Sequence, residues 1–136
     1  MSIFHLNIVT PEREFFSDDI NKVIVRGVEG ELAILKGRAP LITPLKMGKI
    51  KIYQGKDIFI AAIEDGYISV DGDYTIVVTK RAEWPHEIDI EGAVEDKRRA
   101  EEALNRDHGV DVVQAQLSLR RAMNRIEVSE LHKKER

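Results

Sequence analysis

The strongest candidates for chemistry are arginines near the C-terminus. Arg120 and Arg121 are adjacent, and Arg125 follows Arg121 by four positions. On a helix, the four-residue spacing places two guanidinium groups on one face, where they can form paired hydrogen bonds with a carboxylate or a phosphate. The alternative is a solvated basic helix end, which complements the negative end of the helix dipole. The residues alone leave both interpretations open.

Residue types that could support catalysis lack the context that catalysis requires. The histidines show no metal-ligand spacing and are interpreted as surface or structural residues: His5, His86, His108 and His132. The five serines lack a nucleophile elbow, and neither Gly48-Lys49 nor Gly55-Lys56 continues into the serine or threonine of a phosphate loop. We therefore predict a non-catalytic chain with no metal site.

Composition sets further bounds. The chain has 136 residues, a net charge of −3, 43% hydrophobic residues and no cysteine. The charge argues against nucleic-acid binding, which needs a concentrated cationic face, and the missing cysteines exclude disulfides. The longest apolar run is too short to span a membrane, and residues 1–5 do not resemble a signal peptide. We expect a cytoplasmic protein that reaches a membrane only through partners.

The elements that position these residues begin with strands over residues 3–84. Lys49, Lys51 and Tyr53 alternate with isoleucines, which is typical of a half-buried strand. Residues 54–57 and 71–73 each contain glycine and aspartate and predict tight turns. Many short strands at this spacing predict an antiparallel β-sandwich or flattened barrel.

The apolar period changes after Trp84 and Pro85 and becomes helical. Two helical faces, separated by a break at residues 106–109, follow: Ile90, Ala93, Ala100 and Leu104 on the first, then Val112, Ala115, Leu119, Ala122 and Ile126 on the second. Matching alanines predict an antiparallel two-helix hairpin with a narrow seam. The fold class is therefore α+β, with a β-sandwich over residues 1–85 and a helical hairpin over residues 86–136.

The hairpin carries sorted charges and a weak seam. Residues 86–107 hold eight acidic and four basic side chains, whereas residues 108–136 hold four acidic and six basic ones. The second helix could therefore meet either the first helix or an acidic partner. A seam of alanines and single larger residues gains only a few kcal/mol after ordering entropy of roughly 1–2 kcal/mol per residue is subtracted. Such a hairpin can detach, and this predicts a two-position switch.

The segment over residues 27–45 identifies a family by resemblance. It is similar to the epsilon-subunit signature G-x-x-G-E-x-x-I-L-x-x-H-x-P-L-I of F-type ATP synthases, with Arg38 in place of the histidine. Residues 60–70 resemble a second hallmark, A-V-S-G-G-F-L-E-V. The resemblance extends over essentially the whole chain. It implies a non-catalytic rotor subunit in the central stalk of a bacterial proton-translocating ATP synthase.

The resemblance also implies partners and roles. The sandwich would contact the gamma subunit and the membrane c-ring, mainly through residues 27–45, and couple rotation to proton or sodium-ion flow. The hairpin would inhibit ATP hydrolysis by placing Arg120, Arg121 and Arg125 against the acidic motif of the catalytic subunits, which form the alpha/beta assembly. The chain would be a peripheral protein at the cytoplasmic face of the bacterial cell membrane, and it would require no cofactor.

A rival function follows from residues 88–93, which resemble the ATP-binding motif I-D-x-x-R-A of bacillus-type epsilon subunits. The positions that keep the family's nucleotide-binding residues are Glu83, Ile88, Asp89, Ala93, Arg99, Arg121 and Arg125. Gly92 replaces the motif arginine, and Ala103 and Gln114 replace residues that are often basic. Each lost charge-assisted contact costs roughly 1.5–3 kcal/mol, so we expect weak ATP binding. The alternative interpretation is that Asp89 caps the first helix.

Overall fold

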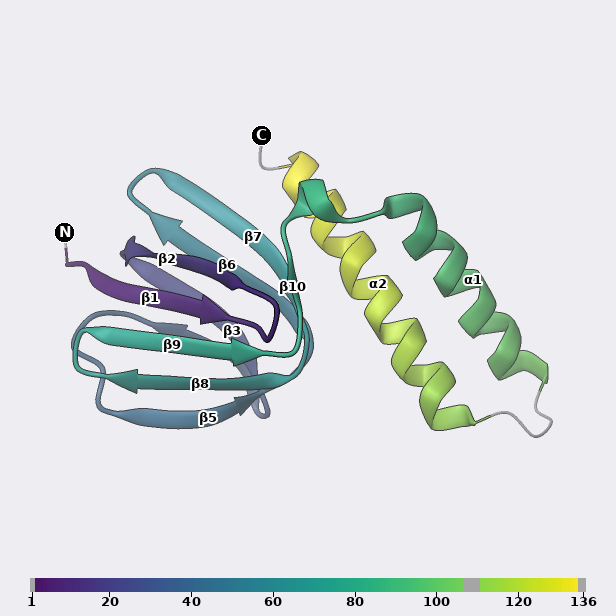
Figure 1. The fold of residues 1–136 in the computed structure, drawn as a ribbon, viewed down its shortest axis with the longest axis horizontal. Helices are drawn as coiled ribbons and strands as arrows, with labels where there is room; N and C mark the ends of the chain where they lie inside the picture. The colour runs from purple at the N-terminus through teal and green to yellow at the C-terminus, as the bar shows by residue number, and fades with distance from the viewer. Residues whose placement is uncertain (1, 107–110, 135–136) are drawn as a thin grey trace. The chain divides into compact units, whose positions relative to one another are not determined.

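The computed structural model describes residues 2–106 and 111–134, which form a strand-rich part and a helical part (Figure 1). The chain divides into two compact units between Glu83 and Trp84. The first unit contains ten strands: β1 (Phe4–Val9), β2 (Glu14–Ile20), β3 (Lys22–Gly27), β4 (Gly30–Ile34), β5 (Leu41–Leu45), β6 (Gly48–Gln54), β7 (Asp57–Ile63), β8 (Gly66–Asp71), β9 (Tyr74–Thr79) and β10 (Ala82–Glu83). The second contains the short helix η1 (Pro85–Glu87) and the helices α1 (Ile90–Arg106) and α2 (Val112–Lys134).

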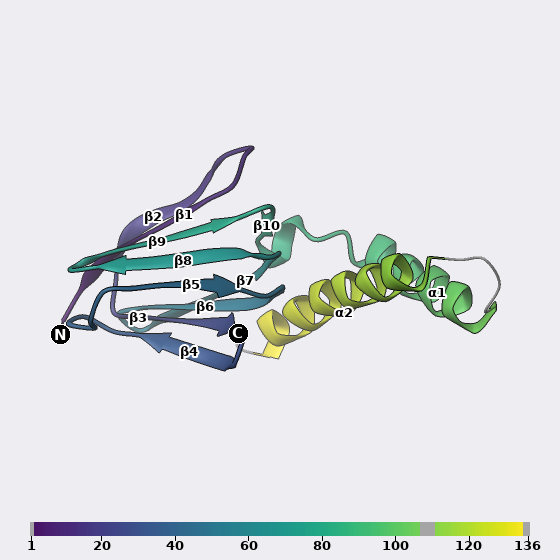
Figure 2. The same cartoon turned by 90° about the horizontal axis from the view of Figure 1, so that it is seen from below.

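The strands form one curved sheet in the order β10-β7-β6-β3-β5-β8-β9-β1-β2, and β4 pairs with β3 (Figure 2). The sheet curls back on itself, so that the edge strand β2 contacts β6, the third strand from the other edge, and the Gln54 side chain donates to the Asp19 carbonyl at 2.7 Å. The predicted sandwich or flattened barrel is confirmed. Among the described strands, β1 and β9 are the one parallel pair, and the other ladders are antiparallel.

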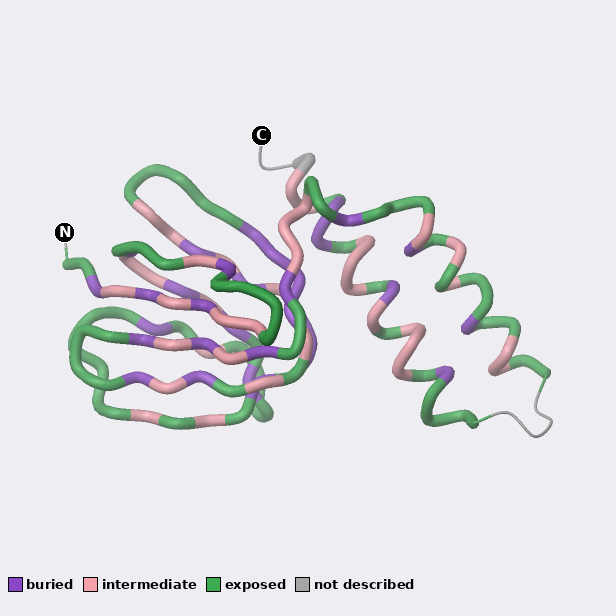
Figure 3. The backbone as a smooth tube through the Cα atoms, viewed as in Figure 1, coloured by how far each residue is buried: buried purple, intermediate pink, exposed green. Residues whose placement is uncertain are grey.

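Alternation along the strands fills the sandwich interior. Ile50 and Ile52 of β6 are fully buried while the residues that alternate with them, Lys49, Lys51 and Tyr53, are half-buried, as predicted (Figure 3). The predicted turns are also present, with Gly55 and Gly72 in the left-handed conformation that glycine adopts without strain. Strand β2 was not predicted, because three consecutive exposed residues interrupt its alternation.

The helical unit is a hairpin of α1 and α2, which run side by side in opposite directions (Figure 1). The buried residues in the described parts of the two helices are mostly small, namely Ala93, Ala100, Ala115, Ala122 and Ser129, and Val128 near the end of α2 is also buried. Ile90 and Val112, at the helix starts, are exposed. The predicted break at residues 106–109 agrees with the end of α1 at Arg106, and Asp107, His108 and Gly109 lie outside the described residues.

Side chains at the helix starts satisfy backbone donors. The Asp89 carboxylate accepts a hydrogen bond from the Gly92 amide at 3.0 Å, and Asp111 accepts one from the Gln114 amide at 3.1 Å. Each aspartate therefore acts as an N-cap, an interaction typically worth about 1 kcal/mol. Neither α1 nor α2, over its described residues, has the length and apolarity needed to cross a membrane.

Candidate functional site

A cavity of about 470 Å³ lies between α1 and α2 and brings together three of the predicted arginines. Arg99 comes from α1, and Arg121 and Arg125 come from α2 one helical turn apart. The other lining residues are Asp96, Ala100, Ala103, Asp111, Gln114, Ala115, Ser118 and Ala122. Small alanine side chains on both helices leave this space open, and the arginines give it the hydrogen-bond donors that an anion needs.

The charge of the cavity is only weakly positive. Asp96 and Asp111 oppose the three arginines, so the described lining carries a formal charge of +1. Ala103 and Gln114 line the cavity and carry no charge. The resemblance to bacillus-type epsilon subunits implies basic side chains at these two positions. The lining suits a small or singly charged anion better than a polyphosphate, whose charge calls for several cations.

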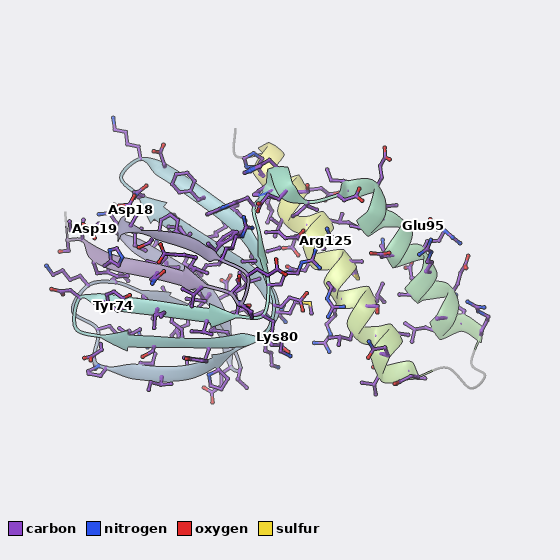
Figure 4. All side chains as sticks on the ribbon, in the orientation of Figure 1. Asp18, Asp19, Tyr74, Lys80, Glu95 and Arg125 are labelled. Atoms are coloured by element: carbon purple, nitrogen blue, oxygen red, sulfur yellow. The ribbon has the colours of Figure 1, made fainter. Side chains whose placement is uncertain are left out.

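Arg99 is shared between the cavity and the surface of α1. The Arg99 Nε lies 3.3 Å from a carboxylate oxygen of Glu95, which Figure 4 labels. Glu95 also forms an ion pair with Arg98, and Arg98 forms a second one with Glu102. The hydrogen bond from Arg98 holds the pKa of Glu95 below its ordinary value, and Glu95 and Glu102 raise the pKa of Arg98. Glu95–Arg99 and Arg98–Glu102 are thus exposed ion pairs between residues four apart on α1, which contribute little to stability.

The remaining predicted nucleotide residues do not line this cavity in the described part of the chain. Ile88 and Ala93 are buried, and Asp89 caps α1. Glu83 lies in β10 and forms an ion pair with Arg81 at 3.5 Å. Arg120 is exposed on α2. The hairpin therefore assembles the arginine part of the predicted site.

A second feature is an apolar patch on the outside of the sheet, which we call the docking face. Strand register places Ile42 of β5 beside Ser69 and then Ile76, and places Pro44 beside Tyr67 and then Val78. Neighbouring Ile68 and Val77 point into the core, so the docking-face residues point outward: Ile42, Pro44, Tyr67, Ile76 and Val78. Ile42 is 75% exposed and Tyr67 is 43% exposed. An exposed, mostly apolar patch of this kind, which only Ser69 interrupts, is typical of an interaction surface.

The docking face borders the hollow formed by residues 27–45. This hollow is lined by Gly27, Val28, Glu29, Gly30, Glu31, Leu32, Arg38, Leu41, Thr43 and Pro44. Val28 and Leu35 nearby are also exposed, at 54% and 52%. The sequence indicated this segment, but it did not indicate Tyr67, Ile76 or Val78. Only the strand register shows that these three residues continue the same surface.

The comparisons with known proteins agree with this two-part architecture. The sequence model described as ATP synthase, Delta/Epsilon chain, beta-sandwich domain matches residues 3–85, and the corresponding long alpha-helix domain matches residues 86–130. The fold and the paired domains therefore define the class of delta/epsilon chains.

Curated relatives identify the branch within that class. The ATP synthase epsilon chain of Halalkalibacterium halodurans is 37% identical over 131 residues, covering 95% of this chain and 98% of that protein. The epsilon chain of Alkaliphilus oremlandii is 43% identical over 108 residues, covering 79% of this chain and 81% of that protein. The chain belongs to the ATP synthase epsilon-chain family.

A solved structure supports the fold. A chain in the cryo-EM structure of the Euglena gracilis mitochondrial ATP synthase, OSCP/F1/c-ring in rotational state 1, matches with a TM-score of 0.77. It is 19% identical, and the match covers 97% of this chain and 82% of that chain. At this identity, the likeness concerns the fold alone.

Proposed function

We propose that this chain is a non-catalytic subunit of the central stalk of a bacterial F-type ATP synthase, peripheral to the cytoplasmic face of the membrane. The sandwich binds the gamma subunit through the docking face and contacts the c-ring through the hollow at residues 27–45. In this position it couples rotation to proton flow. The hairpin restrains ATP hydrolysis when Arg120, Arg121 and Arg125 reach the acidic surface of the catalytic alpha/beta assembly.

The small-residue seam carries the regulatory part of this proposal. Four of the six buried residues in the described parts of α1 and α2 are alanines, with Ser129 and Val128 the other two, and an alanine buries far less apolar area than a leucine. The helices consequently gain little from pairing, and an acidic partner that binds the basic face of α2 can compete with the hairpin. A tightly packed leucine seam would not allow this competition.

Hydrogen bonds within the sandwich hold its last strands, β9 and β10, so these strands do not depend on the hairpin for their position. The Thr79 hydroxyl donates to the Glu64 carbonyl at 2.7 Å, and Arg13 donates to the Ala82 carbonyl at 3.1 Å. These bonds hold β9 and β10 to neighbouring segments of the sandwich. Residues 1–85 should therefore fold and assemble without residues 86–136.

Deleting residues 86–136 should raise ATP hydrolysis by the reconstituted synthase and leave assembly of the chain with the rotor unchanged. Replacing Arg120, Arg121 and Arg125 by alanine should reproduce most of that increase, because the basic face is lost while the helix is retained. Steady-state hydrolysis and co-purification with the gamma subunit provide the two readouts. A matched set of alanines at Lys97, Arg98 and Arg106 of α1 controls for loss of charge. Unchanged hydrolysis after the deletion contradicts the regulatory role.

A second candidate function, ATP sensing, is favoured by the three arginines of the hairpin cavity. We expect the unaltered chain to bind ATP weakly, because Gly92, Ala103 and Gln114 supply no charge. Gly92→Arg should strengthen binding about tenfold or more, since one charge-assisted contact contributes about 1.5–3 kcal/mol and 1.4 kcal/mol is a factor of ten. Isothermal titration with ATP measures both chains, and Val94→Arg adds the same single charge at an exposed position of α1 as the control. Tight binding by the unaltered chain would favour the sensor instead.

A further inference from the structure

Strands β1 and β2 present a row of hydrogen-bonded polar side chains on the outside of the sheet. His5 of β1 lies directly opposite Asp19 of β2, and Ser17 lies two residues before Asp19 on the same strand. The His5 Nδ1 is 3.1 Å from an Asp19 carboxylate oxygen, and the His5 Nε2 is 3.0 Å from the Ser17 hydroxyl. The three side chains thus form a continuous serine–histidine–aspartate chain.

The partners decide where the proton of the imidazole lies. An ionised carboxylate can only accept a hydrogen bond, so Nδ1 must donate to Asp19. In the neutral ring, Nε2 then carries the lone pair and accepts the hydrogen bond from the Ser17 hydroxyl. This tautomer is the one in which a histidine can remove a proton from a serine.

Further contacts restrain the imidazole ring. Tyr74 of β9, labelled with Asp19 in Figure 4, stacks on His5 with a centroid distance of 5.5 Å and an interplanar angle of 17°. The Tyr74 hydroxyl accepts a hydrogen bond from Asn7 at 3.2 Å, and Asn7 is the cross-strand neighbour of Ser17. The ring is therefore held by a stacked neighbour as well as by its two hydrogen bonds.

We propose that Ser17 is an acyl-accepting nucleophile, activated by His5 and Asp19, for small neutral activated esters and thioesters. The Ser17 oxygen attacks the carbonyl carbon of the donor, and its proton moves to His5 Nε2. The bond from the carbonyl carbon to the leaving oxygen or sulfur then breaks, and the leaving group takes the proton from Nε2. The products are an ester on Ser17 and a free alcohol, phenol or thiol, with His5 neutral again.

The surroundings select this class of donor. The site is open, with 35% of the His5 side chain and 59% of the Asp19 side chain exposed, so a small donor can reach it. An open site supplies little binding energy, and the donor must therefore carry a good leaving group. Asp18 adds a second negative charge, because a hydrogen bond from Gln54 and one from the Asp19 amide hold its pKa below the ordinary value. Two adjacent carboxylates disfavour anionic donors such as acyl phosphates.

The test uses the full chain with p-nitrophenyl acetate as the neutral probe. Peptide mapping by mass spectrometry should show acetylation of Ser17 well ahead of Ser69, an outward serine on β8 that serves as the internal control. His5→Gln should slow acetylation of Ser17 by about a hundredfold, the lower end of the range for general base catalysis. Asp19→Asn should slow it as well, because an amide no longer fixes the tautomer. Acetyl phosphate should react more slowly than the neutral ester.

Two results would overturn the proposal. One is acetylation of Ser17 no faster than that of Ser69, and the other is a rate at Ser17 that is unaffected by both His5→Gln and Asp19→Asn. Circular dichroism and the thermal midpoint show whether each variant is folded. If His5→Gln unfolds the chain, Asp19→Asn decides the matter, since its carboxylate is exposed and amide and carboxylate have similar shapes.

Discussion

Gly66→Ala should destabilise the sandwich by about 3 kcal/mol or more, because small-to-large changes cost 1–3 kcal/mol even where side chains can move. A Cβ at Gly66 would lie 1.9 Å from the Val78 carbonyl oxygen and 2.8 Å from the Thr79 Cα. Both atoms belong to the backbone of β9, which cannot yield without breaking its pairing with β8. For a unit of this size, the thermal midpoint should fall by more than about 10 °C.

Gly48→Ala provides the matched control for this prediction. A Cβ at Gly48 would meet the Arg26 Cδ at 3.1 Å and the Arg26 Cβ at 3.3 Å, side-chain contacts that a shift of a few tenths of an ångström relieves. Its thermal midpoint, measured by circular dichroism, should fall by much less than that of Gly66→Ala, because the atoms that a new methyl group meets belong to a side chain and not to a paired backbone. Equal midpoints for the two variants would show that the close approach at Gly66 does not limit stability.

Local patterns predicted the regular parts of this fold. The alternation of β6, the turns at Gly55 and Gly72 and the change to a helical period after Pro85 all depend on neighbours in the sequence. Strand β2 did not follow such a pattern, because Ser17, Asp18 and Asp19 are all exposed at the edge of the sheet. Strand β5 contains Pro44, a residue that usually argues against a strand, and the signature segment was predicted only to turn repeatedly between short strands.

Features that depend on register were beyond the sequence. The parallel pairing of β1 with β9 joins segments about seventy residues apart, and no local period specifies it. The same pairing places Tyr74 on His5, and the β1–β2 register places His5 between Ser17 and Asp19. His5 was accordingly interpreted as a surface or structural residue. In the hairpin, by contrast, equal helical spacing was enough to predict that Arg121 and Arg125 share a face.

Ile42→Glu should weaken the proposed binding of the chain to the gamma subunit by at least about thirtyfold, because changing a central hot-spot residue of an interface costs about 2 kcal/mol or more. The docking face is mostly apolar across three strands, and Ile42 is 75% exposed within it. A carboxylate at this position would lose its water on binding without gaining a partner. Tyr67→Ala, which removes an aromatic side chain from the same face, should weaken binding in the same direction.

The expected loss is specific to the docking face, and the measurement can show this. Ile58→Glu places the same charge on β7, at a residue that is 45% exposed outside that face, and should leave the affinity nearly unchanged. Both variants should keep the thermal midpoint of the unaltered chain, since substitutions at exposed positions change stability by about 0.5 kcal/mol or less. Titration of purified gamma subunit with each folded variant gives the affinities. Equal affinities for Ile42→Glu and Ile58→Glu would contradict a contact with the gamma subunit through β5, β8 and β9. A selective loss of affinity for Ile42→Glu supports the docking face as the surface that binds the gamma subunit.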